Sequence, residues 1–337
     1  MKKTVSFSKG VANLFFHILT RCNLKCSHCY INPLQHGDQT LSLETIVKWL
    51  NAIDVHRPNA NVILLGGEPT LHPDLGEIVK QTKAMGFNSV TVDTNGYLFN
   101  DFLAKVTPDD LDALSFSLDG ASSAINDPLR GKGSYDRCIA GIKRSKAKGF
   151  YTSLIYTVSR ANIHQLDQMI PLVKQLQIDR FFIQAIGIRG SSVQNRPHKT
   201  FADNKQVSRT LWEGIIPFVA NKIADFGITV TYPKVFLSLT EKFECAGKVA
   251  HNYFIFPNGR VYRCPLCEDY PLHSFEIKDN TMMAAPSINE SDLFQLTIPE
   301  GCVMNKLIQP GNIDYTPLGK PCHQIACCLL KEEIKHT

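Results

Sequence analysis

The sequence of 337 residues lacks the features that would place it in a membrane or a secretory pathway. No stretch approaches the ~18 continuous apolar residues that a membrane-spanning helix needs. Residues 1–4 are not followed by the apolar segment and small-residue cleavage site of a signal peptide. Internal repeats and low-complexity stretches are also absent. We therefore expect a soluble, cytoplasmic protein with no membrane partner.

An excess of charge of one sign is missing as well. The 36 Lys and Arg residues only slightly outnumber the 31 Asp and Glu residues, which gives a net charge of +5. The densest basic run, residues 143–148, falls on a predicted helix, where it fits a solvated face. A nucleic-acid-binding surface requires clustered basic residues. We therefore expect no nucleic acid among the partners.

The length and composition are those of a globular protein with a sizeable core. Apolar residues make up 44% and charged residues 20% of the chain, both ordinary values. A single core rarely exceeds ~250–300 residues, so we expect one large domain and a smaller one. The chain also holds 11 cysteines. In a reducing compartment these indicate metal binding or catalysis, whereas disulfides would be expected only in a secreted chain.

Three cysteines follow one another closely near the N-terminus. Cys22, Cys26 and Cys29 have the spacing C-x3-C-x2-C and come directly after the apolar residues 13–19, which are typical of a buried strand. Thiolates are soft ligands that select zinc or iron–sulfur clusters. A [4Fe–4S] cluster normally takes four cysteines, so three would leave one iron open to another ligand. A zinc site is the alternative interpretation of these three cysteines alone.

Strand-like and helix-like segments alternate from residue 13 to about residue 232, which predicts parallel strands joined by right-handed crossovers. The predicted strands are residues 13–19, 61–65, 89–93, 113–118, 152–158 and 180–186. The predicted helices are residues 43–53, 73–85, 135–148 and 163–176. Residues 187–204 are predicted to form a long loop. Six strand–helix units are fewer than those of a complete eight-fold barrel, which takes ~250 residues.

Polar motifs follow the predicted strands at their carboxyl ends, where parallel α/β folds bind their ligands. Gly66, Gly67 and Glu68 follow the second strand. Two glycines allow a close approach of the backbone to a ligand, and a carboxylate beside them can accept from an ammonium group. Taken alone, each motif also fits a turn or a helix cap. The other candidate residues at these ends are Thr94, Asn95, Ser117, Asp119 and, slightly later, Arg130.

The cysteine motif and the strand-end motifs, in this order, resemble the radical S-adenosylmethionine (SAM) superfamily. The resemblance implies an α/β fold with a partial (β/α)6 barrel of TIM type and a [4Fe–4S] cluster on Cys22, Cys26 and Cys29. The open iron would bind the amino and carboxylate groups of SAM, and His28 stands where the superfamily has an aromatic residue. The resemblance implies SAM contacts for Gly66, Gly67, Glu68 (to the ammonium), Thr94, Asn95, Ser117, Asp119 (to the carboxylate or ribose) and Arg130 (to the carboxylate).

Most of the remaining cysteines lie after residue 243. Asn258-Gly259 between two apolar runs is a strong hairpin signal, and a hairpin there would bring Cys264 back towards Cys245. The pattern C-x13-G-x4-C resembles the start of the SPASM and twitch extensions of radical SAM enzymes, which hold auxiliary [4Fe–4S] clusters. The resemblance implies one auxiliary cluster, on Cys245 and Cys264, with Cys322 and Cys327 as the hypothesised further ligands.

The sequence does not assign a role to three further cysteines. Cys267, Cys302 and Cys328 are unassigned, and a zinc site that uses some of them is an alternative. Cys138 falls in a predicted helix and is expected to be a core residue.

These resemblances predict two regions: a radical SAM barrel at residues 1–232, and a small cysteine-rich α+β domain with a β-hairpin at residues 233–337. The expected activity is reductive cleavage of SAM, followed by hydrogen abstraction from a ribosomally made peptide or a protein side chain. Oxidation of a small molecule or a tetrapyrrole by a twitch-type enzyme is the alternative, and a non-catalytic iron–sulfur protein is a third interpretation. The expected partners are the substrate and an electron donor such as flavodoxin or ferredoxin.

Overall fold

The computed structural model describes residues 1–5, 7, 10–99, 101–194, 205–285 and 287–335 of the chain. Most of the described strands belong to one sheet of 13 strands. The predicted loop at residues 187–204 lies partly outside the described ranges, and its described part includes the short helix α8 (Ser191–Gln194). No helix in the described ranges is long and apolar enough to cross a bilayer.

Parallel strands form the centre of the sheet, where β2 to β8 pair in the order of the sequence. The six strands predicted from apolar runs are all present as β2 to β7, with ends that differ by at most one residue. The next strand, β8, continues the same parallel set. These strands are β2 (Ala12–Leu19), β3 (Ala60–Gly66), β4 (Ser89–Thr94), β5 (Ala113–Ser117), β6 (Thr152–Val158), β7 (Arg180–Ala185) and β8 (Thr229–Pro233).

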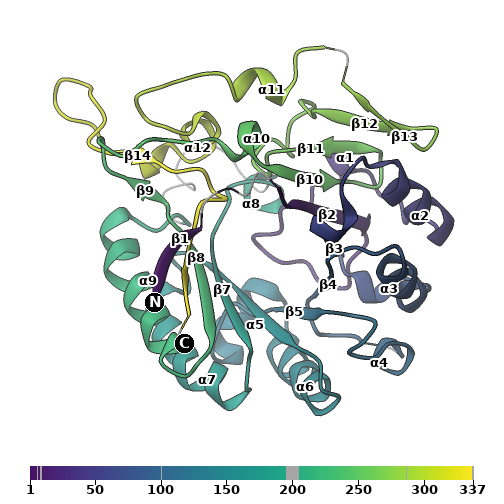
Figure 1. Cartoon of the computed structure of the whole chain (residues 1–337). Helices are drawn as coiled ribbons and strands as arrows, with labels where there is room; N and C mark the ends of the chain where they lie inside the picture. Colours follow the sequence, from purple (N-terminus) through teal and green to yellow (C-terminus); the bar gives the residue numbers. More distant parts are fainter. Residues whose placement is uncertain (6, 8–9, 100, 195–204, 286, 336–337) are drawn as a thin grey trace.

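Helices connect these strands and lie outside them, as Figure 1 shows. Local sequence explains their ends: the Ser42 hydroxyl accepts from the amide of Thr45 (3.1 Å) to cap the first long helix. Gly149, with φ = 83°, follows the helix before β6 in a conformation that favours glycine. The helices are α1 (Pro33–His36), α2 (Leu43–Ala52), α3 (Leu75–Ala84), α4 (Phe102–Lys105), α5 (Ser123–Arg130), α6 (Ser134–Ala147), α7 (Met169–Gln175) and α9 (Arg209–Ala224), with 3-10 turns η1 (Arg57–Asn59), η2 (Pro69–Leu71) and η3 (Ile163–Gln168).

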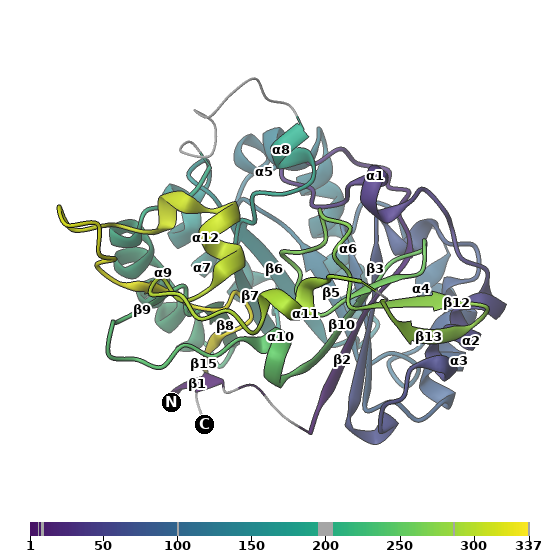
Figure 2. The same cartoon turned by 90° about the horizontal axis from the view of Figure 1, so that it is seen from above.

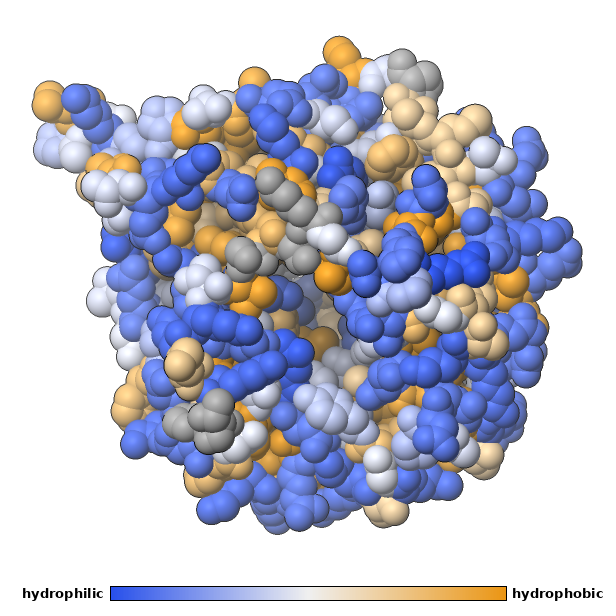
Figure 3. Space-filling model, viewed as in Figure 1, coloured by the Kyte–Doolittle hydropathy of each residue, from blue (hydrophilic) through white to orange (hydrophobic). Residues whose placement is uncertain are grey.

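Successive residues on the strands face opposite sides of the sheet, which separates a packed face from an interior face. Val92, Phe116 and Phe181 are fully buried in the hydrophobic core of the molecule. Asp93 and Phe182 alternate with them, face the interior and are partly exposed. Figure 3 shows the surface hollowed near its centre, where Figure 1 has the interior of the curved sheet. The interior is therefore open to solvent.

Most strands of the segment after residue 232 extend both edges of the central sheet, while β9 (Phe236–Leu237) and β14 (Gln324–Ile325) pair in a separate two-stranded sheet. On one side β10 pairs in parallel with β2, and the predicted hairpin at Asn258-Gly259 joins β10 to β11. On the other side β15 pairs with β8 and with β1. The elements are β1 (Lys2–Val5), β9 (Phe236–Leu237), α10 (Ala246–Val249), β10 (His251–Ile255), β11 (Arg260–Tyr262), β12 (Phe275–Lys278), β13 (Thr281–Ala284), α11 (Glu290–Leu293), α12 (Val303–Ile308), η4 (Pro310–Asn312), β14 (Gln324–Ile325) and β15 (Lys331–Ile334).

The helices of this segment cover the parallel strands on one side. Figure 2 shows α10, α11 and α12 lying across the strands in the view from above. The predicted boundary at residue 232 falls inside β8, and the strands before and after it are joined in one sheet.

Candidate functional site

Residues 20–30, which we call the cysteine loop, leave the carboxyl end of β2 and carry the first three cysteines. The amide of Cys29 donates to the carbonyl of Cys26 (3.2 Å), which turns the loop back on itself. The thiols of Cys26 and Cys29 both act electrostatically on that of Cys22. The three predicted ligands therefore lie on one loop at the carboxyl end of β2.

Burial controls the protonation of these thiols. It raises the pKa of Cys22 to about 12 and that of Cys26 to about 11, and it raises the pKa of Cys29 as well. Because only thiolates bind metal, a cluster that binds here must displace these protons. Three soft sulfur donors at one strand end fit an iron–sulfur cluster.

The two glycines after β3 pack against the start of the cysteine loop. A Cβ atom on Gly66 would lie 2.1 Å from the carbonyl oxygen of Leu19, and one on Gly67 would lie 2.2 Å from that of Arg21. The amides of Gly67 and Glu68 donate to these same two carbonyls, each at 3.0 Å. Glycine is needed here for a close backbone approach, as the sequence predicted, and the partner it approaches is the cysteine loop.

The Glu68 carboxylate is fully buried and links β3 to β4. Its Oε1 atom accepts from the amide (3.1 Å) and hydroxyl (2.7 Å) of Thr70 and from the Thr94 hydroxyl (2.7 Å). Its Oε2 atom accepts from the amide of Asn95 (2.7 Å). Burial raises the pKa of Glu68, while these hydrogen bonds act against the rise. Glu68 thus caps η2, the structural role that its motif also allowed, and holds the end of β4.

Asn95 carries this link to the cysteine loop. Its Nδ2 atom donates to Oδ1 of Asn23 (2.8 Å) and lies 3.8 Å from Sγ of Cys22. Its Oδ1 atom accepts from the amide of Tyr97 (2.9 Å), which fixes the orientation of the amide group. Glu68, Thr94 and Asn95 therefore form one chain of contacts that ends at a predicted cluster ligand.

Asp119 and Arg130 form a buried ion pair under the cysteine loop. Nε of Arg130 and Nε2 of His28 lie 2.6 Å and 3.0 Å from Oδ2 of Asp119. Burial alone would raise the pKa of Asp119, but Arg130 and His28 hold it at about 2. The Cys26 thiol also lies 3.7 Å from the Arg130 carbonyl. Sequence reasoning assigned Asp119 and Arg130 to SAM and missed the contact between Asp119 and His28, although His28 stands inside the cysteine motif.

Polar groups face the open interior below these strand ends. Ser117 is partly exposed there, and Asp93 accepts a hydrogen bond from Ser115. Nζ of Lys331, on β15, lies 4.2 Å from the ring centre of Phe182. Burial raises the pKa of Asp93 to about 7 and lowers that of Lys331 to about 8. Sequence reasoning missed Lys331, because nothing local shows that β15 pairs with β8.

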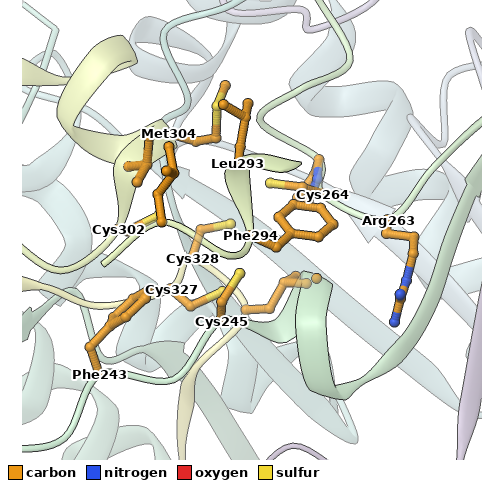
Figure 4. A pocket seen from close by; sticks show the side chains of 15 residues that line it. Phe243, Cys245, Arg263, Cys264, Leu293, Phe294, Cys302, Met304, Cys327 and Cys328 are labelled. Carbon is orange, nitrogen blue, oxygen red and sulfur yellow. The ribbon is translucent and has the colours of Figure 1, made fainter. Parts of the chain in front are cut away.

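A second group of cysteines lines a pocket of about 470 Å³, partly open to solvent, in the C-terminal segment. Figure 4 shows their side chains gathered around one space, beside the ring of Phe294. The cysteines that line it are Cys245, Cys264, Cys302, Cys327 and Cys328.

Three of the hypothesised auxiliary ligands, Cys245, Cys264 and Cys327, therefore lie together. Cys322 is exposed and does not line the pocket, whereas Cys302, at the start of α12, does. Cys302 was missed because it is isolated in the sequence. All eleven cysteines are free thiols, and Cys138 is buried in the core, as predicted. In the described ranges, no three His, Cys, Asp or Glu side chains are arranged to hold a single metal ion.

Residues 16–173 match the sequence profile of the Radical SAM superfamily. This stretch, a little under half of the chain, is the part that matches the radical SAM superfamily, and we call it the radical SAM domain. The radical SAM domain runs from within β2 to within α7, so it includes the cysteine loop and the ends of β3, β4 and β5. Proteins of this superfamily use a [4Fe–4S] cluster and SAM, and the sulfur donors of the cysteine loop fit such a cluster.

Two curated proteins are similar to part of the chain. A probable GTP 3′,8-cyclase of Saccharolobus islandicus (strain L.S.2.15) is 30% identical over 181 residues, or 52% of this chain and 58% of that protein. The pre-heme d1 synthase of Dinoroseobacter shibae is 28% identical over 201 residues, or 59% of this chain and 48% of that protein. The chain thus spans about half the length of these relatives.

A solved structure shares the fold over a longer stretch. Streptococcus suis SuiB, bound to the precursor peptide SuiA, superposes with a TM-score of 0.61 and 16% identity, over 90% of this chain and 65% of that one. The likeness in fold therefore includes part of the cysteine-rich segment after the radical SAM domain.

Proposed function

We propose that this protein is an enzyme that cleaves SAM reductively and abstracts a hydrogen atom from a peptide or a protein side chain. The observation that carries the proposal is the convergence of three strand ends on the cysteine loop. Glu68 after β3, Asn95 after β4 and Asp119 after β5 each contact that loop through a backbone or side-chain group. In this proposal Cys22, Cys26 and Cys29 hold the cluster.

Cys22, Cys26 and Cys29 would hold the cluster, which would supply the electron for reductive cleavage of SAM and so the radical chemistry of hydrogen abstraction. The residues of the chain determine where this takes place. Glu68 and Asn95 hold one side of the cysteine loop, and the Asp119–Arg130 pair holds the other. The open interior of the sheet lies beside them and offers a space from which bulk water can be excluded once it is filled.

Residues at the strand ends are proposed to contact SAM. Their backbones and hydroxyls surround the cysteine loop at the position where parallel sheets bind ligands. Glu68 and Arg130 are already paired within the protein, so we propose that they act chiefly by holding their neighbours in place. The residues of the proposed SAM site are Gly66, Gly67, Glu68, Thr94, Asn95, Ser117, Asp119 and Arg130.

One auxiliary [4Fe–4S] cluster is proposed in the pocket of Figure 4. Cys245, Cys264, Cys302 and Cys327 all line this pocket, and we propose these four residues as the ligands. Cys302 thus takes the place that the sequence interpretation gave to Cys322. A donor of flavodoxin or ferredoxin type is proposed to supply the electrons.

A peptide is the proposed substrate because SuiB, whose fold this chain shares, was solved with its precursor peptide. A small anionic molecule is the second candidate. Two observations favour it: the relatives are named for reactions of GTP and of a heme precursor, and the Lys331 amine faces the interior. Faster 5′-deoxyadenosine formation with candidate precursor peptides, but not with GTP or a tetrapyrrole, would select the peptide.

The function is tested by anaerobic purification, metal analysis and incubation with SAM and dithionite. We expect about eight irons per chain, four for each cluster, and formation of 5′-deoxyadenosine. About four irons would remove the auxiliary cluster from the proposal. Zinc without iron would refute the proposal as a whole.

Two cysteine variants separate the two sites. Cys26→Ala should abolish 5′-deoxyadenosine formation, because this thiol belongs to the SAM site. Cys245→Ala should leave part of it, because that thiol belongs to a different site. Equal loss in two folded variants would mean that the auxiliary cluster is required to build or reduce the first one.

A further inference from the structure

The two cysteine sites are joined by the segment that follows β7. The Arg189 guanidinium lies 4.7 Å from the ring centre of Tyr30, the residue directly after Cys29. Its Nη1 atom also forms an ion pair with Glu268 and donates to the carbonyl of Pro265, the residue directly after Cys264. One side chain thus contacts neighbours of a cysteine in each site.

Backbone contacts on both sides of Arg189 strengthen this junction. The amide of Ser191 donates to the Cys29 carbonyl (2.7 Å), and the amide of Gly190 donates to Oδ2 of Asp269 (2.7 Å). A Cβ atom on Gly190 would lie 2.4 Å from the Cys29 carbonyl oxygen, so the segment is pressed against the cysteine loop. The other carboxylate oxygen of Asp269 accepts from Nδ2 of Asn32 (3.4 Å), which follows the same loop.

The junction is enclosed as well as connected. The side chains of Arg189 and Glu268 are 16% and 1% exposed. Removing one partner of such a pair leaves the other buried without its countercharge, which is strongly destabilising. The Arg189 and Glu268 side chains are therefore held in one fixed position relative to each other.

We propose that Arg189 is a positioning residue that fixes the cysteine loop relative to the segment at residues 264–269, and so fixes the two iron–sulfur sites relative to each other. The inference rests on the proposed function for the identity of the two sites. The contacts themselves are properties of the chain.

An arginine is required because three different groups are contacted at once. Its planar guanidinium can stack on the Tyr30 ring while its edge donates to a carboxylate and to a carbonyl. A lysine ammonium is a point charge without this planar edge. Arg189→Lys should therefore keep the positive charge but lose the stacking on Tyr30 and the simultaneous contacts with Glu268 and the Pro265 carbonyl.

The experiment compares Arg189→Met and Arg189→Lys with the matched control Arg180→Met, prepared anaerobically as the full chain. Arg180 also lies on the β7 segment and pairs with a glutamate, Glu333 (2.9 Å), but at the opposite end of the strand. Two readouts are used: hydrogen–deuterium exchange of the backbone, and the EPR spectra of the reduced clusters.

In both Arg189 variants we expect residues 187–192 and 264–270 to exchange at least tenfold faster than in wild type. The EPR signals of the reduced clusters should change in line shape or relaxation rate, because the two sites are no longer held at a fixed distance and orientation. Arg180→Met should leave both readouts as in wild type. Wild-type exchange and EPR spectra in a folded Arg189→Met protein would overturn the inference.

Full rescue by Arg189→Lys would also overturn it, because charge alone would then be sufficient. If Arg189→Met does not fold, Arg189→Lys supplies the same two readouts. Iron analysis separates this inference from the proposed function. A wild-type protein with about four irons would refute the auxiliary cluster, while hydrogen exchange alone would still decide whether Arg189 joins the two segments.

Discussion

Oδ2 of Asp119 lies 2.6 Å from Nε of Arg130 and 3.0 Å from Nε2 of His28. One carboxylate oxygen therefore connects a helix end to the middle of the cysteine motif. The sequence predicted Asp119 and Arg130 as contacts of SAM. Their geometry supports a positioning role instead, in which they hold the cysteine loop that would bind the cluster.

The first prediction follows from this pair. Asp119→Leu should lower the free energy of unfolding by about 3–5 kcal/mol, because it leaves the Arg130 guanidinium buried and unpaired. The double variant Asp119→Leu/Arg130→Met should be more stable than Asp119→Leu alone. Denaturant unfolding of each variant measures both quantities. As a control, Glu213→Gln breaks a surface pair with Arg209 and should cost no more than about 0.5 kcal/mol.

If the double variant were less stable than Asp119→Leu alone, the Arg130 guanidinium would have other partners that matter more than Asp119. The buried pair would then not be the unit that supports the cysteine loop.

The second prediction concerns Glu68. The Glu68 carboxylate accepts four hydrogen bonds. Glu68→Gln keeps the shape of the side chain but replaces one acceptor oxygen with an NH2 group, which cannot accept. At least one donor is then unsatisfied, which should cost about 1–3 kcal/mol of stability. The dissociation constant for SAM should rise at least tenfold, with iron content unchanged.

SAM titration followed through the EPR signal of the cluster measures this affinity. Glu77→Gln, an exposed change on α3, should leave it unchanged. Wild-type affinity in Glu68→Gln would mean that the link from Glu68 to Asn95 does not shape the SAM site.

The third prediction distinguishes the cysteines of the C-terminal segment. Cys302→Ala should reduce the iron content from about eight to about four per chain, because Cys302 lines the pocket. Cys322→Ala should keep about eight, because Cys322 is exposed outside it. Iron and sulfide analysis of the two proteins, purified side by side, gives the answer. The reverse result would restore Cys322 as a ligand.

The fourth prediction concerns His36, which stacks on Phe256 with ring centres 3.9 Å apart. The amide of Asn32 donates to its Nδ1 atom (3.0 Å), so Nε2 carries the proton and donates to the Glu268 carbonyl (2.9 Å). Burial lowers the pKa of His36 to about 4. In the unfolded chain His36 takes up a proton near pH 6.5, so folding stability is complete above that pH and falls as the pH drops towards 4.

Between pH 7 and pH 5.5 the loss from this residue should be about 1 kcal/mol. Urea unfolding at the two pH values measures it, and His36→Gln should show a smaller decrease because glutamine does not titrate. His17 adds to the decrease in both proteins, since burial lowers its pKa in the same direction. An equal decrease in wild type and His36→Gln would show that His36 is protonated in the folded protein.

The parallel strands could be predicted because the signal for each is local. An apolar run such as residues 61–65 between turn residues needs no partner to be recognised, and β3 occurs there. The cysteine loop and the candidate residues at the strand ends followed from the same reasoning, since parallel strands place their carboxyl ends together.

The contacts between distant segments could not be predicted in this way. Nothing in residues 251–255 shows that they pair with residues 12–16, and nothing near Lys331 places it against Phe182. Recognising a motif in the sequence also did not show which group the motif contacts in the folded protein. Gly67 and Glu68 are at the predicted place, but whether they face a ligand or the cysteine loop depends on the path of residues 19–21.

The pairing of β1 with β15 has a consequence for the order of events during synthesis. Lys2 lies opposite Ile334, and β15 separates β1 from the rest of the sheet. The strand at residues 2–5 must therefore wait until residues 331–334 have been made before it has this partner. Contacts of such large sequence separation are slow to form. This edge of the sheet, with Lys331 on its interior face, cannot form before residues 331–334 have been synthesised.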